Sequence, residues 1–211
     1  MNTTSAMVYV VDDDAGVRKG MSRLITAAGY RVETFETGRA YLQRPASDDP
    51  WPACMLLDVN MPDLNGLDLQ RELSDADSIL PIIFLSGQAD VPMSVRAMKQ
   101  GAADFITKPA EEGVLFEVIA RAMDRAVRNA ALKAEIDSIK RRIASLTPRE
   151  HEVMQHVVAG RLNKQIAGDI GTVLKTVKVH RGRVMKKMGV HTLADLVRCI
   201  AKISSIVPRN G

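Results

Sequence analysis

Five polar side chains in the first half of the chain stand where short strand-like runs end. They are Asp12 and Asp13 after the run 8–11, Asp58 after 54–57, Ser86 after 81–85, and Lys108 after 104–107. Three carboxylates brought together would repel one another and raise some of their pKa values, and a divalent cation such as Mg²⁺ relieves that repulsion through oxygen ligands. The lysine adds a positive charge and the serine a hydroxyl donor. This set of groups suits a phosphoryl group carried on a carboxylate.

An aspartate at the end of a strand can also serve only as a helix cap, and the aspartates differ in this respect. For Asp14 we favour the cap, because an apolar helical stripe begins just after it. Asp58 follows four apolar residues and precedes the segment 59–62, Val-Asn-Met-Pro. It therefore ends a buried strand and is the better candidate for chemistry.

The runs that position these residues alternate with helical patterns. The expected strands are 8–11, 31–35, 54–59, 81–85 and 104–107, and the expected helices are 15–28, 38–43, 67–73, 95–100 and 111–128, with a loop over 45–52. This order predicts an α/β fold, a doubly wound, flavodoxin-like five-stranded parallel sheet with right-handed crossovers. Such sheets bind ligands beyond the carboxyl ends of their strands, which is where the polar side chains stand.

Composition excludes several other classes of protein. The 211 residues are 46% apolar and 26% charged, which is ordinary for a globular protein. The longest apolar stretches, 53–57 and 79–85, are far shorter than the roughly 20 residues of a membrane span. The N-terminus lacks the basic segment of a signal peptide, and the two cysteines lie far apart in apolar contexts. We therefore expect a cytoplasmic protein with no membrane partner.

Charge is unevenly divided along the chain. Residues 1–130 hold 13 Lys and Arg against 19 Asp and Glu, a net charge of −6. Residues 131–211 hold 16 Lys and Arg against 6 Asp and Glu, a net charge of +10. An acidic part joined to a basic part indicates two modules with different partners, and the basic part favours a polyanion such as nucleic acid.

The basic part has the pattern of a small all-helical module. A capping box at 147–150 opens the first helix, further helices are expected over 164–169 and 174–188, and a last one follows Thr192. In the helix over 174–188, the stripe of Val177, Val184 and Met188 faces inward. The opposite face carries Lys175, Lys178, Val179, Gly182, Arg183 and Lys186. This arrangement indicates a helix-turn-helix whose basic face enters the major groove of DNA.

The segment between the two parts carries an apolar stripe at heptad spacing. Its members are Leu132, Ile136, Ile139, Ile143 and Leu146. The stripe could form a short coiled coil with a second chain or pack on its own domain, and the sequence leaves both possibilities open. The segment has neither Gly nor Pro. We therefore expect a helical linker over 126–145 between domains of residues 1–125 and 146–211.

The motifs of the first part resemble the receiver domain of two-component response regulators. They are VVDDD, LLDVNMPDLNG, FLSGQAD and DFITKP, and the segment 90–102 resembles the FixJ-type subgroup. The resemblance spans about residues 6–125 and implies that Asp58 accepts a phosphoryl group. It also implies that Asp13, Asp58 and the backbone carbonyl of Asn60 bind Mg²⁺ or Mn²⁺, while Asp12 orients metal-bound water.

The same resemblance assigns three further residues. Lys108 pairs with the phosphoryl oxygens, Ser86 turns its hydroxyl toward the phosphate, and Phe105 rotates inward with it. For Phe105 a plain core role is an equal alternative. The chain departs from the family at Ser86, where threonine is commoner, and at Ala110, where phenylalanine is usual after the Lys-Pro pair. Neither change removes a chemical group, so we expect a working receiver.

The second part resembles the LuxR-type output domain. The similarity rests on Leu-Thr-Pro-Arg-Glu at 146–150, Asn-Lys-Gln-Ile-Ala at 163–167 and Thr-Val-Lys-Val-His at 176–180. It implies that Lys178, Val179 and Gly182 face base edges, although Gly182 has no side chain where a longer one is common. The candidates for contact with phosphates are Lys164, Thr176 and Lys186.

These features together predict a transcription regulator controlled by phosphorylation and not a dedicated enzyme. A histidine kinase supplies the phosphoryl group to Asp58, and the modified protein forms a homodimer on double-stranded DNA. A second hypothesis is a constitutive DNA-binding protein whose receiver serves only for dimerisation. A phosphatase of the haloacid-dehalogenase type is disfavoured, because such enzymes need a second aspartate where this chain has Asn60.

Overall fold

The computed structural model describes residues 6–45, 52–87 and 91–204. The chain divides into two compact units, which are residues 1–131 and residues 132–211. No helix in the described ranges is both long enough and apolar enough to cross a membrane.

The described part of the first unit is built on a five-stranded parallel sheet, which confirms the predicted fold class. Its strands are β1 (Met7–Val11), β2 (Arg31–Phe35), β3 (Ala53–Asp58), β4 (Ile82–Ser86) and β5 (Asp104–Thr107). They lie in the order β2-β1-β3-β4-β5, and every neighbouring pair is parallel. The strand order reverses between β1 and β3, so their carboxyl ends flank the crevice in which such sheets bind ligands.

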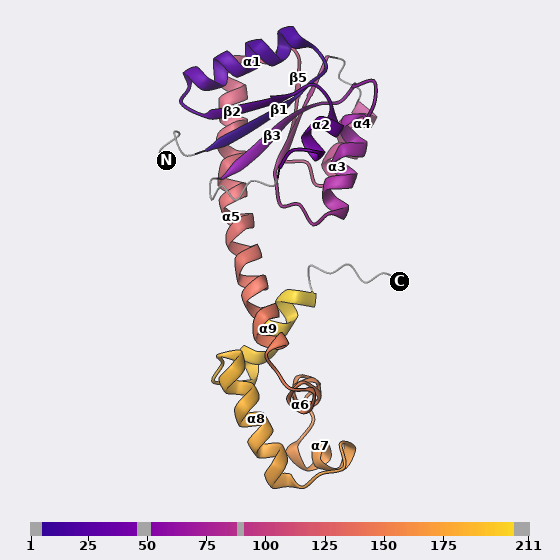
Figure 1. The fold of residues 1–211 in the computed structure, drawn as a ribbon, viewed down its shortest axis with the longest axis vertical. Coiled ribbons are helices and arrows are strands. Elements are labelled where there is room, and N and C mark those ends of the chain that lie inside the picture. Colours follow the sequence, from indigo (N-terminus) through magenta and orange to yellow (C-terminus); the bar gives the residue numbers. More distant parts are fainter. Residues whose placement is uncertain (1–5, 46–51, 88–90, 205–211) are drawn as a thin grey trace. The chain divides into compact units, whose positions relative to one another are not determined.

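The helices of the first unit cover both faces of the sheet (Figure 1). They are α1 (Ala15–Ala27), α2 (Gly38–Leu42), α3 (Gly66–Asp75), α4 (Val91–Lys99) and α5 (Glu112–Ala144). Helices α1 and α5 bury Ile25, Leu115 and Ile119 on one face. Helices α2, α3 and α4 pack on the other, where Tyr41 and Leu69 are buried.

The central strands β3 and β4 are apolar up to their last residue, because both of their faces are covered. In β3, Cys54 and Leu56 join the core beneath α1 and α5, while Met55 and Leu57 join the core on the opposite face. Burial raises the pKa of the Cys54 thiol to about 12. That cysteine is therefore an inert core residue, as its apolar context predicts.

Two helix boundaries differ clearly from the prediction. Helix α4 begins at Val91 and not near residue 95, since Pro92 fits the first helical turn, where its missing N–H has no intrahelical partner to lose. The helices expected over 111–128 and 126–145 are one helix, α5, because no Gly or Pro interrupts the chain from residue 114 to residue 147. Residues 46–51 of the expected loop lie outside the described ranges.

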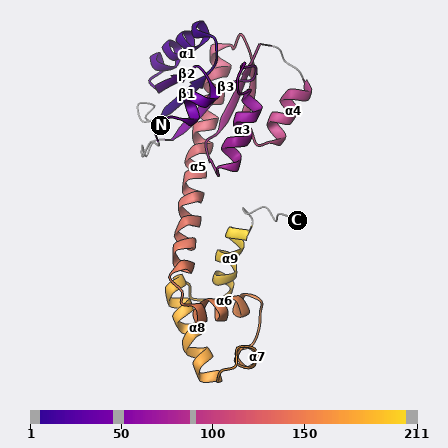
Figure 2. The ribbon, with the colours of Figure 1, turned by 45° about the vertical axis from the view of Figure 1, so that its right-hand side comes forward.

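The second unit combines the end of α5 with a group of helices around one core (Figure 2). They are α6 (Pro148–Val158), α7 (Asn163–Asp169), α8 (Leu174–Met188) and α9 (Leu193–Ser204). Helix α6 packs against α8 and α9, and α7 packs against α8. The predicted inward stripe of α8 is confirmed, since Val177, Val184 and Met188 are fully buried.

The apolar stripe at the end of α5 packs mainly on this core. Ile139 is 3% exposed and belongs to the core, while Ile143 and Leu146 pack against it. Leu132, at the start of the stripe, is 45% exposed. The structure therefore supports packing within the same domain for the later part of the stripe.

Polar contacts fix the C-terminal end of α8. Gly189 ends the helix with a φ of +63°, a conformation that favours glycine. The Arg142 guanidinium donates to the carbonyl oxygen of Met188 at 3.0 Å, and so satisfies one of the free carbonyls at the helix end. The Lys187 ammonium donates to the Glu150 carboxylate at 2.6 Å, which ties α8 to the first turn of α6.

Glu150 also completes the capping box of α6, and its side chain is only 3% exposed. The Thr147 hydroxyl accepts from the Glu150 amide, and the Thr147 amide donates to the Glu150 carboxylate at 2.9 Å. The Lys187 ammonium first, and then the Thr147 amide, lower the pKa of Glu150 from 4.5 to about 2. Folding therefore favours the ionised carboxylate.

This pKa shift predicts a pH-dependent stability of the second unit. Because the folded pKa lies below the unfolded one, the contribution of Glu150 is fully present above about pH 4.5 and is lost as the pH falls toward 2. We expect Glu150→Gln to destabilise the chain at neutral pH, and the difference from wild type to shrink with acid. Unfolding monitored by exchange of the α6 and α8 amides checks this. Glu152→Gln, at an exposed pair with Arg149, is the control, and a difference independent of pH would contradict the prediction.

Candidate functional site

Three of the predicted residues meet beyond the carboxyl ends of the strands. The Lys108 ammonium lies 2.6 Å from Asp12 Oδ2 and 2.5 Å from Asp58 Oδ1. Asp12 directly follows β1, Asp58 is the last residue of β3, and Lys108 directly follows β5. These side chains are far apart in sequence, and the parallel topology brings them to one edge of the sheet.

Burial makes this cluster electrostatically strong. Asp12 is 1% exposed and Asp58 is 5% exposed, so neither carboxylate is well solvated. Burial by itself lowers the pKa of Lys108, but the hydrogen bonds and charges of Asp12 and Asp58 outweigh it, and the net shift is upward. The lysine therefore stays protonated and offsets charge that the apolar surroundings would otherwise penalise.

Backbone groups hold each member of the cluster in place. The amide of Asn60 donates to Asp58 Oδ2 at 2.6 Å, and the amide of Asp14 donates to Asp12 Oδ1 at 3.0 Å. The Lys108 amide donates to the carbonyl oxygen of Ser86 at 2.7 Å, which fixes the start of the loop after β5. The peptide bond between Lys108 and Pro109 is cis. Asp14 caps α1 as predicted, since its carboxylate accepts from Gly16 and Val17.

The remaining predicted site residues lie around this cluster in different environments. Ser86, the last residue of β4, is fully buried. Phe105 is half-buried, and its ring centroid lies 6.2 Å from that of Phe84, so it packs in the core. Asp13 and Asn60 are exposed. Within the described residues, no three His, Cys, Asp or Glu side chains are grouped as they would be around a metal ion. The oxygen donors present nonetheless match the chemistry of Mg²⁺, which prefers carboxylates, carbonyls and water.

Two supporting residues were not anticipated from the sequence. Arg18 of α1 donates to the carbonyl oxygen of Asp12 at 2.8 Å and so braces the turn after β1. Gly66, the first residue of α3, lies against the backbone at the end of β3. A Cβ atom on Gly66 would stand 2.4 Å from the carbonyl oxygen of Asp58, which is too close for any side chain. The Asn-Gly pair at 65–66, just after the acidic motif, is the sequence signal that could have indicated this close approach.

In the second unit, the predicted DNA-facing residues lie on an open face of α8. The exposed ones are Lys175, Lys178, Val179, Gly182, Arg183 and Lys186, together with Lys164 on α7. Thr176 is half-buried. No acidic side chain pairs with these lysines or with Arg183 among the described residues. A helix with a buried apolar stripe and an unpaired basic face suits a groove of DNA.

Arg181 of α8 has a structural role. It is half-buried and donates to the Asn163 side chain at 3.0 Å, which links α8 to the start of α7. Together with the Lys187–Glu150 pair, this bond fixes the rotation of α8 about its axis. Both contacts join residues that are distant in sequence, so the spacing of residues along the chain does not predict them.

Comparison with known proteins agrees with both units. Residues 8–120 match the family model described as the response regulator receiver domain. Residues 144–200 match that of bacterial regulatory proteins of the luxR family. The two matches together cover most of the chain.

Similar proteins of known name share this arrangement over nearly their whole length. Response regulator protein TmoT of Ectopseudomonas mendocina is 40% identical over 96% of this chain and 91% of its own. Transcriptional regulatory protein FixJ of Rhizobium meliloti is 40% identical over 92% of this chain and 95% of its own. The solved structure of response regulator StyR is 38% identical, covers 94% of this chain and 99% of its own, and has a TM-score of 0.72.

The parallel sheet with its acid–lysine cluster is a receiver domain, and the helical unit is a LuxR-type helix-turn-helix domain. The chain belongs to the family of two-component response regulators that carry this DNA-binding domain. The family consists of transcription regulators and is not a dedicated class of enzymes. Its two domains imply a histidine kinase and DNA as partners.

Removal of the shared lysine is predicted to destabilise the receiver. Lys108→Met leaves Asp12 and Asp58 buried without a counter-charge, and we expect a loss of about 2 kcal/mol, since the lysine is partly exposed. Adding Asp12→Asn to that variant removes one of the two repelling charges and should restore part of the loss. Urea unfolding of the two variants checks this. No recovery in the double variant would show that charge repulsion is not the cause.

The close approach at Gly66 gives a second prediction for the site. Gly66→Ala forces the backbone of Asp58 to move, and we expect a loss of about 2 kcal/mol in receiver stability. Gly20→Ala in α1, where a Cβ meets nothing within 4 Å, should instead be neutral or stabilising by up to about 1 kcal/mol. Urea unfolding measures both, and equal effects of the two substitutions would contradict the prediction.

Proposed function

We propose that Asp58 is the residue of this response regulator that accepts the phosphoryl group from a histidine kinase. The observation that carries this assignment is the Lys108 ammonium, which lies within hydrogen-bond distance of both Asp12 and Asp58 at the switch point of the sheet. A carboxylate oxygen of Asp58 attacks phosphorus, the bond from phosphorus to the kinase histidine nitrogen breaks, and an acyl phosphate forms. Positioning and charge stabilisation carry such a transfer.

The neighbouring residues act on the charge of that group. Lys108 is already held at Asp58 and pairs with the phosphoryl oxygens once they arrive. Ser86, buried at the end of β4, donates its hydroxyl to the phosphoryl group. Asp13, Asp58 and the backbone carbonyl of Asn60 would hold Mg²⁺ or Mn²⁺, with Asp12 oriented toward its bound water. The metal ion, when bound, offsets the negative charge of the phosphoryl group and the acids.

Phosphorylation then biases a two-state element of the receiver. Contact between Ser86 and the phosphoryl group draws the β4 end inward, and Phe105 on the neighbouring strand rotates with it. The surface over residues 92–122 changes with this shift and pairs two receivers. Apolar side chains already exposed on that surface support this role, among them Val95, Met98 and Val114.

Dimerisation presents two copies of α8 to double-stranded DNA. Lys178, Val179 and Gly182 face base edges, and Lys164, Thr176 and Lys186 contact phosphates. Lys175 and Arg183 add charge to the same face. The support for these assignments is the exposure of that face and the absence of acidic partners among its described residues. We place the receiver domain at 1–125, the linker at 126–145 and the DNA-binding domain at 146–211, in a protein of the cytoplasm.

The assignment of Asp58 is tested with a small phosphodonor such as acetyl phosphate and Mg²⁺. We expect the wild type to gain one phosphoryl group by intact mass, to shift toward a dimer in sedimentation, and to bind DNA more tightly. Asp58→Asn should show none of these changes, because it has no carboxylate to accept the group. Asp63→Asn, an exposed residue paired with Arg39, is the matched control and should behave as wild type. Equal DNA binding of the wild type with and without phosphodonor would favour the constitutive alternative.

The DNA-facing side of α8 is tested by salt dependence. Lys186→Ala removes one proposed phosphate contact, so binding to a mixed-sequence duplex should weaken. The negative slope of log K against log salt should become less steep by about 1. Lys140→Ala removes an exposed lysine of α5 that lies outside α8, and its slope should equal that of wild type. Titrations at several salt concentrations measure both slopes. An unchanged slope for Lys186→Ala would remove that residue from the interface.

A further inference from the structure

A cavity of the receiver lies at the opposite edge of the sheet from Asp58. It has a volume of about 500 Å³. Its floor is formed by the amino-terminal ends of strands, with Met7 at the start of β1, Ala53 at the start of β3 and Pro81 just before β4. The proposed phosphorylation chemistry uses none of these residues. The cavity is within the 300–1,000 Å³ range that is typical of small-molecule sites.

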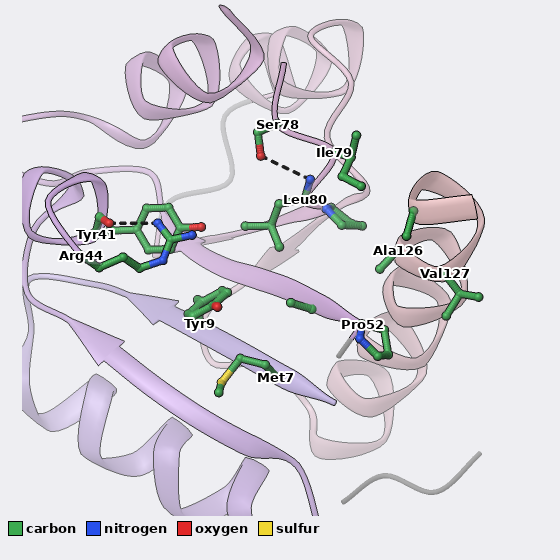
Figure 3. Close-up of a pocket in the computed structure, with 13 residues that line it drawn as sticks. Met7, Tyr9, Tyr41, Arg44, Pro52, Ser78, Ile79, Leu80, Ala126 and Val127 are labelled. Atoms are coloured by element: carbon green, nitrogen blue, oxygen red, sulfur yellow. Dashed lines mark hydrogen bonds between the residues drawn. The ribbon is translucent and has the colours of Figure 1, made fainter. Parts of the chain in front are cut away.

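One wall of the cavity is polar and carries the guanidinium of Arg44, which contacts two tyrosine rings. Figure 3 shows Arg44 stacked on Tyr41, with Tyr9 nearby on β1. The Arg44 Cζ atom is 3.8 Å from the centroid of the Tyr41 ring and 5.1 Å from that of Tyr9. Contact with two aromatic rings, whose planes are 70° apart, restricts the guanidinium without neutralising its charge.

Among the described residues, the guanidinium of Arg44 makes one hydrogen bond. Its Nη1 donates to the carbonyl oxygen of Tyr41 at 3.0 Å. Among the described residues, its buried Nε has no hydrogen-bond partner and no carboxylate pairs with Arg44. Buried donors are usually satisfied, so an orphaned guanidinium nitrogen at a cavity wall needs an explanation. A planar two-oxygen anion is the group that a guanidinium fork binds best.

The facing wall of the cavity is apolar. Figure 3 shows Ala126 and Val127 of α5 across the cavity from Arg44, with Ile79 and Leu80 between them. Asn129 of α5 donates to the carbonyl oxygen of Ile79 at 2.8 Å and holds that loop against the helix. Ile79 is 37% exposed and Val127 is 43% exposed, so this wall presents unburied apolar surface to an occupant.

We propose that this cavity binds a small carboxylate that carries an apolar group, either an aryl ring or a short alkyl chain. The carboxylate pairs with Arg44, and the apolar group lies against Ile79, Leu80 and Val127. A guanidinium binds carboxylates and phosphates alike, and the apolar wall favours an anion that carries an apolar group over a fully polar one. The cavity shares no residue with the proposed phosphorylation site, and it lies at the opposite ends of the strands from Asp58.

Binding is tested by calorimetric titration of the full chain with benzoate and hexanoate. We expect at least one of them to bind, and the neutral analogues benzamide and hexanamide to bind at least tenfold more weakly. Arg44→Gln should weaken carboxylate binding at least tenfold. Arg39→Gln is the matched control, because that arginine is close to Arg44 in sequence but pairs with Asp63 at the surface.

A second measurement keeps the test decisive if Arg44→Gln does not fold. In the wild type, amide chemical shifts should move with ligand at Met7, Tyr9 and Leu80, and not at Asp58 or Lys108. The ratio of the affinities for benzoate and hexanoate shows whether the site prefers an aryl or an alkyl group. The proposal is overturned if neither acid binds, if the amides bind as tightly as the acids, if a folded Arg44→Gln retains wild-type affinity, or if the shifts map elsewhere.

Discussion

The structure of the receiver depends on one buried charge arrangement, a lysine shared between two carboxylates. Asp12 and Asp58 are almost fully buried at the end of an apolar sheet, and such charges are costly unless they are compensated. Lys108 supplies that compensation from the end of a third strand. Parallel strands are required for it, since only they bring three carboxyl ends to one edge. The site that we propose to accept the phosphoryl group is thus the place where the fold already compensates buried charge.

The second unit uses polar contacts differently, to orient a helix and not to build a reactive cluster. Its core holds the apolar stripe of α8. Arg142 of α5 donates to the carbonyl oxygen at the end of α8, while Arg181 and Lys187 of α8 donate to side chains of α7 and α6. The cationic residues of α8 therefore fall into two sets. Those that bind inside the domain set the rotation of the helix, and those that remain exposed present an unpaired positive face, which is what a polyanion needs.

The two ends of the sheet offer two chemically different environments. At the carboxyl ends, acids and a lysine form a compact, mutually satisfied cluster. At the amino ends, an arginine lies over the Tyr41 ring beside an apolar wall, and its Nε has no partner among the described residues. The same strands, β1 and β3, run from one environment to the other. Helix α5 lines the second environment and continues into the DNA-binding unit.

The sequence by itself determined the fold class, the order of elements, the cap at Asp14, the inward stripe of α8 and the residues of the acid–lysine cluster. These follow from local periodicity, capping chemistry and the rule that polar groups at strand ends share one edge. Only the tertiary structure decided that Gly66 must lack a side chain, that Arg181 and Lys187 serve the fold, and that Arg44 lies over the Tyr41 ring at the wall of a cavity. Each of these depends on atoms from segments distant in sequence, and their distances are fixed by packing and not by any local pattern.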